Sequence, residues 1–190
     1  MGGQGYAGER GGTGPRIGLA EWVVLAVAAE RPVHGFAIAA LTASDGALGR
    51  VWQIPRPVVY RAIGRLVDAG LLSAEAVETG GGPPRTLYAS TGEGAERVAC
   101  WLTAPVPHVR DLRSEFLLKL AVLHRRGVGP AELVAAQRRA LQPIVAALRL
   151  EQDGADDFDR TLVAWRRVSA EAALSFLDEI PGCEAPADSG

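Results

Sequence analysis

The chain has 190 residues, of which 48% are hydrophobic and 22% are charged, and its formal net charge is −2. This length and composition suit a globular protein with one medium core or two small ones, and they exclude a chain that is disordered throughout. The net charge excludes coating of nucleic acid by bulk electrostatics, although positive charge can still be concentrated on a single element.

The sequence shows neither a membrane segment nor a metal-binding pattern. No apolar run reaches the roughly 18 uncharged residues of a spanning helix, and the glycine-rich residues 1–16 lack the apolar stretch of a signal peptide. We therefore expect a cytoplasmic protein without a membrane partner, with a flexible tail over 1–16 and a loose tail over 181–190. Cys100 and Cys183 have no ligand-like spacing, which predicts free thiols and no zinc site.

Two helices are expected first. Residues 17–30 are apolar almost throughout, which indicates a buried helix, and the proline and glycine within 31–35 end it. A second helix is expected over about 36–43. Residues 44–49 then have the composition of a loop.

The third predicted helix spans about residues 56–69 and has two different faces. Its apolar stripe, at helical spacing, consists of Val59, Ile63 and Leu66. Arg61 and Arg65 lie one turn apart on another face. Residues 55–67 contain three arginines and no acid, whereas residues 17–104 contain seven arginines and eight acidic residues. Positive charge is therefore concentrated on this helix.

A hairpin and a fourth helix follow. Gly70 is placed to cap the third helix, and two strand-like segments at 71–78 and 85–90 flank a stretch of glycine and proline that suits a turn. Thr91 is a candidate N-cap for a helix that ends near residue 102.

The C-terminal half is predicted to be all helix. Residues 103–108 contain two prolines and mark a boundary between domains. Three stretches of helical period follow, at 109–126, 129–153 and 156–180. Their broad apolar faces exceed what a thin layer of helices can bury, which favours association with a second copy of the chain. We therefore predict one domain over 17–104 and a helical dimerisation domain over 108–180.

Three helices, a hairpin and a further helix are the order of a winged helix-turn-helix. In this fold the third helix enters the major groove of double-stranded DNA, and the hairpin, or wing, reaches the flanking backbone. The predicted fold class is therefore mainly α, with a small β-hairpin wing and an all-helical C-terminal domain. Helical geometry makes Arg56 and Arg61 candidates for contacts to guanine edges or phosphates.

Several motifs, taken in their order and spacing, resemble the PadR-like transcriptional regulators. The segment HGFAIAAL (34–41) resembles the start of that family's second helix, and VWQIPRPVVYRAIGRLVDAGLL (51–72) resembles its recognition segment. GGPPRTLYASTGEG (81–94) is similar to the family's wing, and RSEFLLKLAVL (113–123) resembles the start of the C-terminal domain in one branch. The resemblance covers most of residues 19–180.

The resemblance implies a homodimer, built by the C-terminal helices, that binds a pseudo-palindromic operator and usually represses its target. Some members release DNA when a small phenolic or planar aromatic compound binds. Tyr60 then matches a contact to the DNA backbone, and Arg65 matches either a phosphate contact or an ion pair at the edge of the core. Arg85 matches the arginine of the wing.

The wing departs from the family pattern. Pro83, Thr86 and Ala89 stand where basic residues are common, so three phosphate contacts are missing. Each lost contact makes the slope of the logarithm of DNA affinity against the logarithm of salt concentration shallower by roughly one. We therefore predict modest affinity that depends mainly on the recognition helix and on Arg85.

The tryptophans and histidines have competing interpretations. Trp101 and Trp165 are either core residues or stacking partners for a flat ligand, whereas Trp22 and Trp52 are expected in the core, with Trp52 bracing the recognition helix. The three histidines stand alone and are taken as structural or surface residues. The acids at 156–159 are expected to complement a helix dipole instead of binding a metal.

Two other classes of function are alternatives to a DNA-binding regulator. A winged-helix module that binds protein instead of DNA is compatible with the acidic net charge and the depleted wing. An enzyme is the weakest alternative, because no nucleophile, base and orienting group can be assembled from the sequence and no cofactor motif is present. We therefore expect no catalytic activity and no cofactor.

Overall fold

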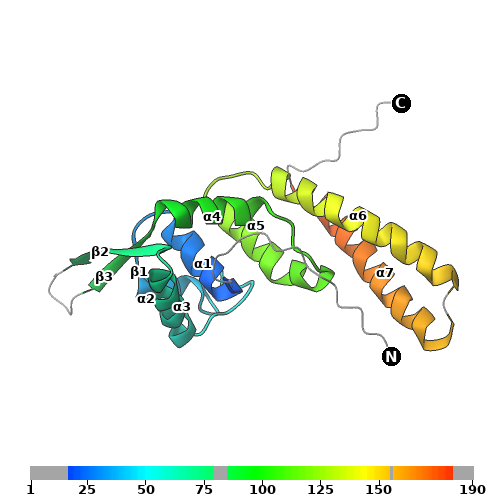
Figure 1. Cartoon of the computed structure of the whole chain (residues 1–190), viewed down its shortest axis with the longest axis horizontal. Coiled ribbons are helices and arrows are strands. Elements are labelled where there is room, and N and C mark those ends of the chain that lie inside the picture. Colours follow the sequence, from blue (N-terminus) through cyan, green and yellow to red (C-terminus); the bar gives the residue numbers. More distant parts are fainter. Residues whose placement is uncertain (1–16, 79–84, 155, 182–190) are drawn as a thin grey trace.

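A computed structural model describes residues 17–78, 85–154 and 156–181 of the chain (Figure 1). The predicted tail at 1–16, the hairpin tip at 79–84 and residues 182–190 lie outside the described residues.

The helices are α1 (Leu19–Ala28), α2 (Gly35–Leu41), α3 (Arg56–Asp68), α4 (Gly92–Thr103), the short 3-10 turn η1 (Val109–Arg113), α5 (Glu115–Arg125), α6 (Ala131–Gly154) and α7 (Asp157–Asp178). The strands are β1 (Val33–His34), β2 (Leu72–Glu78) and β3 (Arg85–Ser90). The mainly α fold with a small antiparallel sheet confirms the predicted class.

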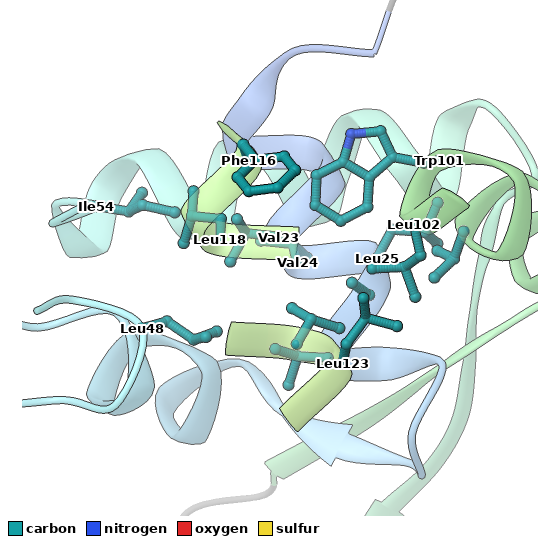
Figure 2. Packing of buried hydrophobic residues seen from close by; sticks show 14 of the residues in the cluster. Val23, Val24, Leu25, Leu48, Ile54, Trp101, Leu102, Phe116, Leu118 and Leu123 are labelled. Atoms are coloured by element: carbon teal, nitrogen blue, oxygen red, sulfur yellow. The ribbon is translucent and has the colours of Figure 1, made fainter. Parts of the chain in front are cut away.

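Helix α1 is the centre of the core. Residues 23–28 are all fully buried, as the unbroken apolar sequence predicted. Figure 2 shows Val23, Val24 and Leu25 among side chains from α4, from α5 and from the segment before α3. A helix that is apolar on all sides is stable in water only when other elements cover every side of it. The remaining helices are therefore arranged around α1.

Helix α3 begins at a pair of prolines and buries one stripe. Pro57 lies in its first turn, where a missing N–H costs little. Val59, Ile63 and Leu66 are buried and form the predicted stripe. Helix α3 packs this stripe against α1 and α2, and its opposite face stays exposed.

Gly70 ends α3 as predicted. Its φ is +70°, a left-handed conformation that favours glycine. The Gly70 N–H donates to the Val67 carbonyl and the Leu71 N–H donates to the Leu66 carbonyl, both at 2.9 Å. This pair of bonds is a Schellman motif, and it turns the chain directly into β2.

The hairpin of β2 and β3 is confirmed, and the sheet has a third strand that the sequence did not predict. The order is β1-β3-β2, and Val33 pairs with Tyr88 while His34 pairs with Leu87. The Nδ1 atom of His34 lies 3.1 Å from the Thr86 carbonyl oxygen, which gives this histidine a structural contact. Strand β1 has two residues, too few for an alternating pattern to appear in the sequence.

Thr91 caps α4 as predicted and also joins α4 to the end of α3. The Gly94 N–H donates to the Thr91 hydroxyl at 3.1 Å, and this hydroxyl donates to the Gly70 carbonyl at 2.9 Å. A Cβ atom at Gly94 would overlap the carbonyl oxygen of Leu71. The Thr-x-x-Gly motif therefore consists of a cap and a point of close backbone approach.

The apolar core continues across the predicted domain boundary at 103–108. Helix α5 packs against α1, and Phe116 and Leu118 belong to the same buried cluster as α1 (Figure 2). Arg125 donates two hydrogen bonds to the Glu30 carboxylate, at 3.1 and 2.7 Å, and so ties the ends of these two helices together. The division into domains at 103–108 stays a prediction.

Two details of the sequence prediction are wrong. The stretch 109–126 is not one helix, because Ser114, with φ −122° and ψ −79°, separates η1 from α5. Trp52 is not a core residue: it is 36% exposed, and the buried Leu48 and Ile54 occupy the core on either side of it in the sequence. A large aromatic side chain next to α3 was therefore not sufficient to predict burial.

Helices α6 and α7 form an antiparallel arm that projects from the rest of the molecule (Figure 1). We define the root of the arm as the part whose buried residues belong to the common core: Leu133, Val134, Leu141, Ala173 and Leu177. The outer arm lies beyond Pro143 of α6 and carries exposed apolar side chains. None of the helices in the described part of the chain is long and apolar enough to cross a membrane.

The two glycines of the α3 region give a matched pair for a stability test. Gly70→Ala should lower the free energy of unfolding by about 1 kcal/mol, because alanine is strained in the left-handed region. Gly64→Ala should raise it by about 0.5 kcal/mol or more, because Gly64 lies inside α3 with open space around it. Urea denaturation of both variants measures the difference, and effects of the same sign would contradict the assigned cap.

Candidate nucleic-acid interface

The exposed face of α3 brings together four of the five predicted DNA-binding residues. Arg56, Tyr60, Arg61 and Arg65 are all exposed on α3, away from its buried stripe. Asp68, at the last residue of the helix, is the one acid of α3. The face is therefore positively charged along most of its length.

Tyr60 is held in place from two sides. The Arg56 guanidinium lies 5.6 Å from the centre of the Tyr60 ring, one helical turn away, in a cation–π arrangement. A Cβ atom at Gly35 would lie 2.9 Å from Cε1 of Tyr60 and 3.1 Å from Cδ1 of Ile63. A glycine at the start of α2 therefore lets α2 approach α3 closely, which is a physical reason for the His-Gly motif.

Arg65 forms an ion pair within the protein. Its Nη1 atom donates to Oε1 of Glu21 in α1 at 3.0 Å. The Arg65 side chain is 75% exposed, whereas that of Glu21 is only 14% exposed. The geometry matches the ion-pair alternative from the sequence, and most of the guanidinium remains accessible to solvent. Sequence reasoning did not name Glu21, although it is the one acid within an otherwise apolar first helix.

The wing is described only in part. Arg85 opens β3 opposite Glu78 of β2, and its side chain lies outside what the structure describes, as does Pro83. Ala89 is buried in the core. A charged side chain at that position could not reach a phosphate without moving the sheet, so the predicted loss of a contact does not apply to Ala89.

The structure does not bring the two candidate ligand-binding tryptophans together. Trp101 of α4 is 5% exposed, stacks on Trp22 with ring centroids 5.3 Å apart, and donates its indole N–H to Glu115 at 2.8 Å. Trp165 of α7 is 71% exposed on the outer arm. Trp101 therefore fits the core alternative in this conformation, whereas Trp165 is free to stack on another surface.

No group of three or more metal-ligating side chains occurs within the described ranges. Asp157 and Asp159 lie in the first turn of α7, where carboxylates complement the positive end of the helix dipole, as predicted.

A comparison with models of protein families covers the part of the chain that contains this surface. Residues 24–99, from the middle of α1 into α4, match the model of the transcriptional regulator PadR-like family. The chain carries a PadR-like domain. The match takes in α3 and both strands of the wing, and it stops before α5 and the arm. Among curated proteins, none is a significant match to the chain.

Solved structures of PadR proteins are distantly similar to the chain. Bacillus subtilis PadR in complex with operator DNA is 18% identical, with a TM-score of 0.43 over 84% of this chain and 96% of that one. Bacillus subtilis PadR in complex with p-coumaric acid is 16% identical, with a TM-score of 0.39 over 85% and 93%. The PadR-like regulator BC1756 from Bacillus cereus is 18% identical, with a TM-score of 0.39 over 84% and 94%.

The Glu21–Arg65 ion pair should contribute measurably to stability. A double-mutant cycle with Glu21→Gln and Arg65→Ala should give a coupling energy of about 0.5 kcal/mol, since one partner is well exposed and the pair is screened by salt. The same cycle with Arg61→Ala is the control, and its coupling should be near zero. Equal couplings for both arginines in urea denaturation would show that the pair is absent in solution.

Proposed function

We propose that the chain is a dimeric transcriptional repressor that acts in the cytoplasm and binds a pseudo-palindromic operator in double-stranded DNA. The observation that carries this proposal is the exposed face of α3, which presents Arg56, Tyr60, Arg61 and Arg65 in a PadR-like domain. Arginine fits both tasks that such a helix performs, because its planar guanidinium binds guanine edges or phosphates with two hydrogen bonds.

The residues of α3 have different proposed roles. Arg61 is exposed and forms no hydrogen bond or ion pair with another described side chain, so it is the best candidate for reading a base edge or binding a phosphate. Arg56 orients Tyr60, whose hydroxyl is suited to a backbone contact. Arg65 already pairs with Glu21, and its DNA contact would be a phosphate reached by its exposed atoms. Arg85 would add the contact from the wing.

The outer arm supports the proposed dimer. Helix α7 carries one exposed stripe at spacings of three or four residues: Phe158, Thr161, Trp165, Val168, Ala172 and Phe176. Its other apolar stripe, Val163, Ala170, Ala173 and Leu177, is buried within the chain. A second stripe with this spacing is typical of a helix that packs against another helix in a left-handed bundle. The partner that fits it best is the same stripe of a second copy, related by a two-fold axis.

A small aromatic effector is part of the same proposal. The exposed indole of Trp165 offers a flat surface on which a planar ring can stack, and its place on the proposed interface would couple ligand binding to the geometry of the dimer. Trp101, which is buried, could take part only after a rearrangement that opens the Trp22–Trp101 stack. The effector contact is therefore proposed first for Trp165.

Operator binding is tested by selection of bound sequences from random DNA at two salt concentrations. The wild-type protein should select two related half-sites, and Arg61→Ala should weaken binding by about 1–3 kcal/mol with relaxed selection at one position if Arg61 reads a base. If Arg61 binds a phosphate, the loss should be uniform and the salt slope should fall by about one.

Asp68→Asn is the control for this experiment, because Asp68 ends α3 and its substitution should not weaken binding. Release of the selected DNA by a planar aromatic acid tests the effector. Failure of the wild-type protein to select any sequence would contradict the proposal, and it would favour the alternative of a winged-helix module that binds another protein.

The dimer is tested on the exposed stripe of α7. Trp165→Glu should yield a folded monomer at micromolar concentration, because two-fold symmetry would place two buried carboxylates near each other, while the monomer loses no core contact. Arg160→Glu, at an exposed position on α7 off the stripe, is the control and should remain dimeric. Sedimentation equilibrium measures the mass, and a Trp165→Glu dimer would contradict this interface.

A further inference from the structure

The direction of the arm determines what a dimer can bind. Helix α6 has 24 residues, which corresponds to about 36 Å at 1.5 Å per residue. A small rotation at the root therefore moves the outer arm by several ångströms. If the outer arms form the dimer, the same rotation changes the separation of the two α3 helices, one in each copy.

The root of the arm is fixed by a buried side-chain amide as well as by apolar packing. Gln137 of α6 is fully buried, and its Oε1 accepts a hydrogen bond from the Val106 N–H at 2.7 Å. Its Nε2 donates to the Val106 carbonyl at 3.2 Å. One side chain thus satisfies both backbone groups of a buried residue in the segment between α4 and η1. We call this pair of hydrogen bonds the Gln137 clasp.

The same segment is held on its other side by α5. Nζ of Lys119, the one lysine of the sequence, donates to the Ala104 carbonyl at 2.8 Å and lies 3.0 Å from the Glu115 carboxylate. Glu115 also accepts the indole N–H of Trp101, which stacks on Trp22 of α1. Residues 104–106 are therefore connected to α1 through α5 and α4, and to the arm through Gln137.

Apolar packing and the clasp constrain the root in different ways. The contact of Phe116 with Phe176, with ring centroids 6.4 Å apart, and the buried leucines of the root stabilise contact between the arm and the body. Burial of apolar area has no preferred direction, so such surfaces can slide or rotate at low cost. Two hydrogen bonds from one planar amide to one residue require a single orientation, and breaking them would leave buried backbone groups unpaired.

We propose that Gln137 is a positioning residue that fixes the direction of the α6–α7 arm relative to α3 and thereby sets the separation of the two recognition helices in the dimer. The proposal rests on the proposed function, since it needs a dimer that binds two half-sites. It adds a specific residue, far from the DNA, that determines which spacing of half-sites the dimer accepts.

The test uses Gln137→Met in the full chain. Methionine keeps the length of the side chain and the helix propensity but removes both hydrogen bonds. A series of duplexes carries the two half-sites that the wild-type protein selects. The distance between the half-sites increases by one base pair from each duplex to the next, over one helical turn in total. The wild-type dimer should prefer one spacing. In Gln137→Met, the affinity ratio between the best and the neighbouring spacings should fall by about fivefold or more.

Val134→Ala is the matched control. Val134 is buried in the root of the same helix, so its truncation should lower Tm without changing the preferred spacing. Gln137→Leu is the second variant, used if Gln137→Met does not fold. Leucine also lacks the two hydrogen-bonding groups and favours a helix, so it should also flatten the preference.

The outcomes separate this inference from the proposed function. If the folded Gln137 variants keep the wild-type ratios between spacings and change only Tm, the clasp is a structural contact and the inference is overturned. If the wild-type protein is monomeric or selects no half-sites, the proposed function fails, and the inference fails with it. A flattened preference in the Gln137 variants together with an unchanged preference in Val134→Ala supports the positioning role.

Discussion

Complete burial of α1 is the constraint on which the rest of the structure depends. Because residues 23–28 have no accessible face, α3, α4, α5 and the sheet must surround this helix. Helix α3 contributes its one apolar stripe to that cover, which leaves its arginines in solvent. Glu21 lies near the start of α1, just before full burial begins, and its carboxylate meets Arg65 there. The charged surface of α3 is thus a consequence of how α1 is covered.

Sequence patterns predicted the elements whose signals are local. The apolar run of α1, the stripe of α3, the glycine cap at Gly70 and the threonine cap at Thr91 each depend on residues within one or two helical turns. The same reasoning located four of the five candidate DNA-binding residues on one exposed face. Their roles in DNA binding stay predictions.

The features that sequence reasoning missed depend on contacts between distant segments. Strand β1 exists because β3 pairs with it, and nothing within Val33 and His34 requires a strand. The Gln137 clasp joins residues 31 positions apart, and its partner is the backbone of Val106. Every residue type offers a backbone carbonyl, so the side chain of the partner gives no sign of such a bond. Neither the Gln137 clasp nor the bond of Lys119 to the Ala104 carbonyl could therefore be predicted from residue types.

Helix α7 shows how a sequence can predict association without locating the surface. Its apolar residues are too many for one stripe, and the structure divides them between a buried stripe and an exposed one. The buried stripe includes the small side chains of Ala170 and Ala173, whereas Phe158 and Trp165 are largely exposed. The salt bridge of Arg149 with Glu171 also connects α6 and α7 at 2.9 Å. Phe158 and Trp165 are therefore available to a partner, whereas Phe176 also contacts Phe116 of the core.

Burial of the polar groups around residues 104–106 costs desolvation free energy, which burial of apolar side chains would not. Burial lowers the pKa of Lys119, and the hydrogen bond and negative charge of Glu115 oppose this shift by favouring the ammonium. Replacing such buried charged groups with well-packed apolar residues is often neutral or stabilising, so stability alone does not account for them. Directional bonds do account for them, because they select one arrangement among several that apolar surfaces would permit. In this molecule these bonds lie where the arm joins the rest of the chain. A small change of angle there causes the largest displacement of the outer arm.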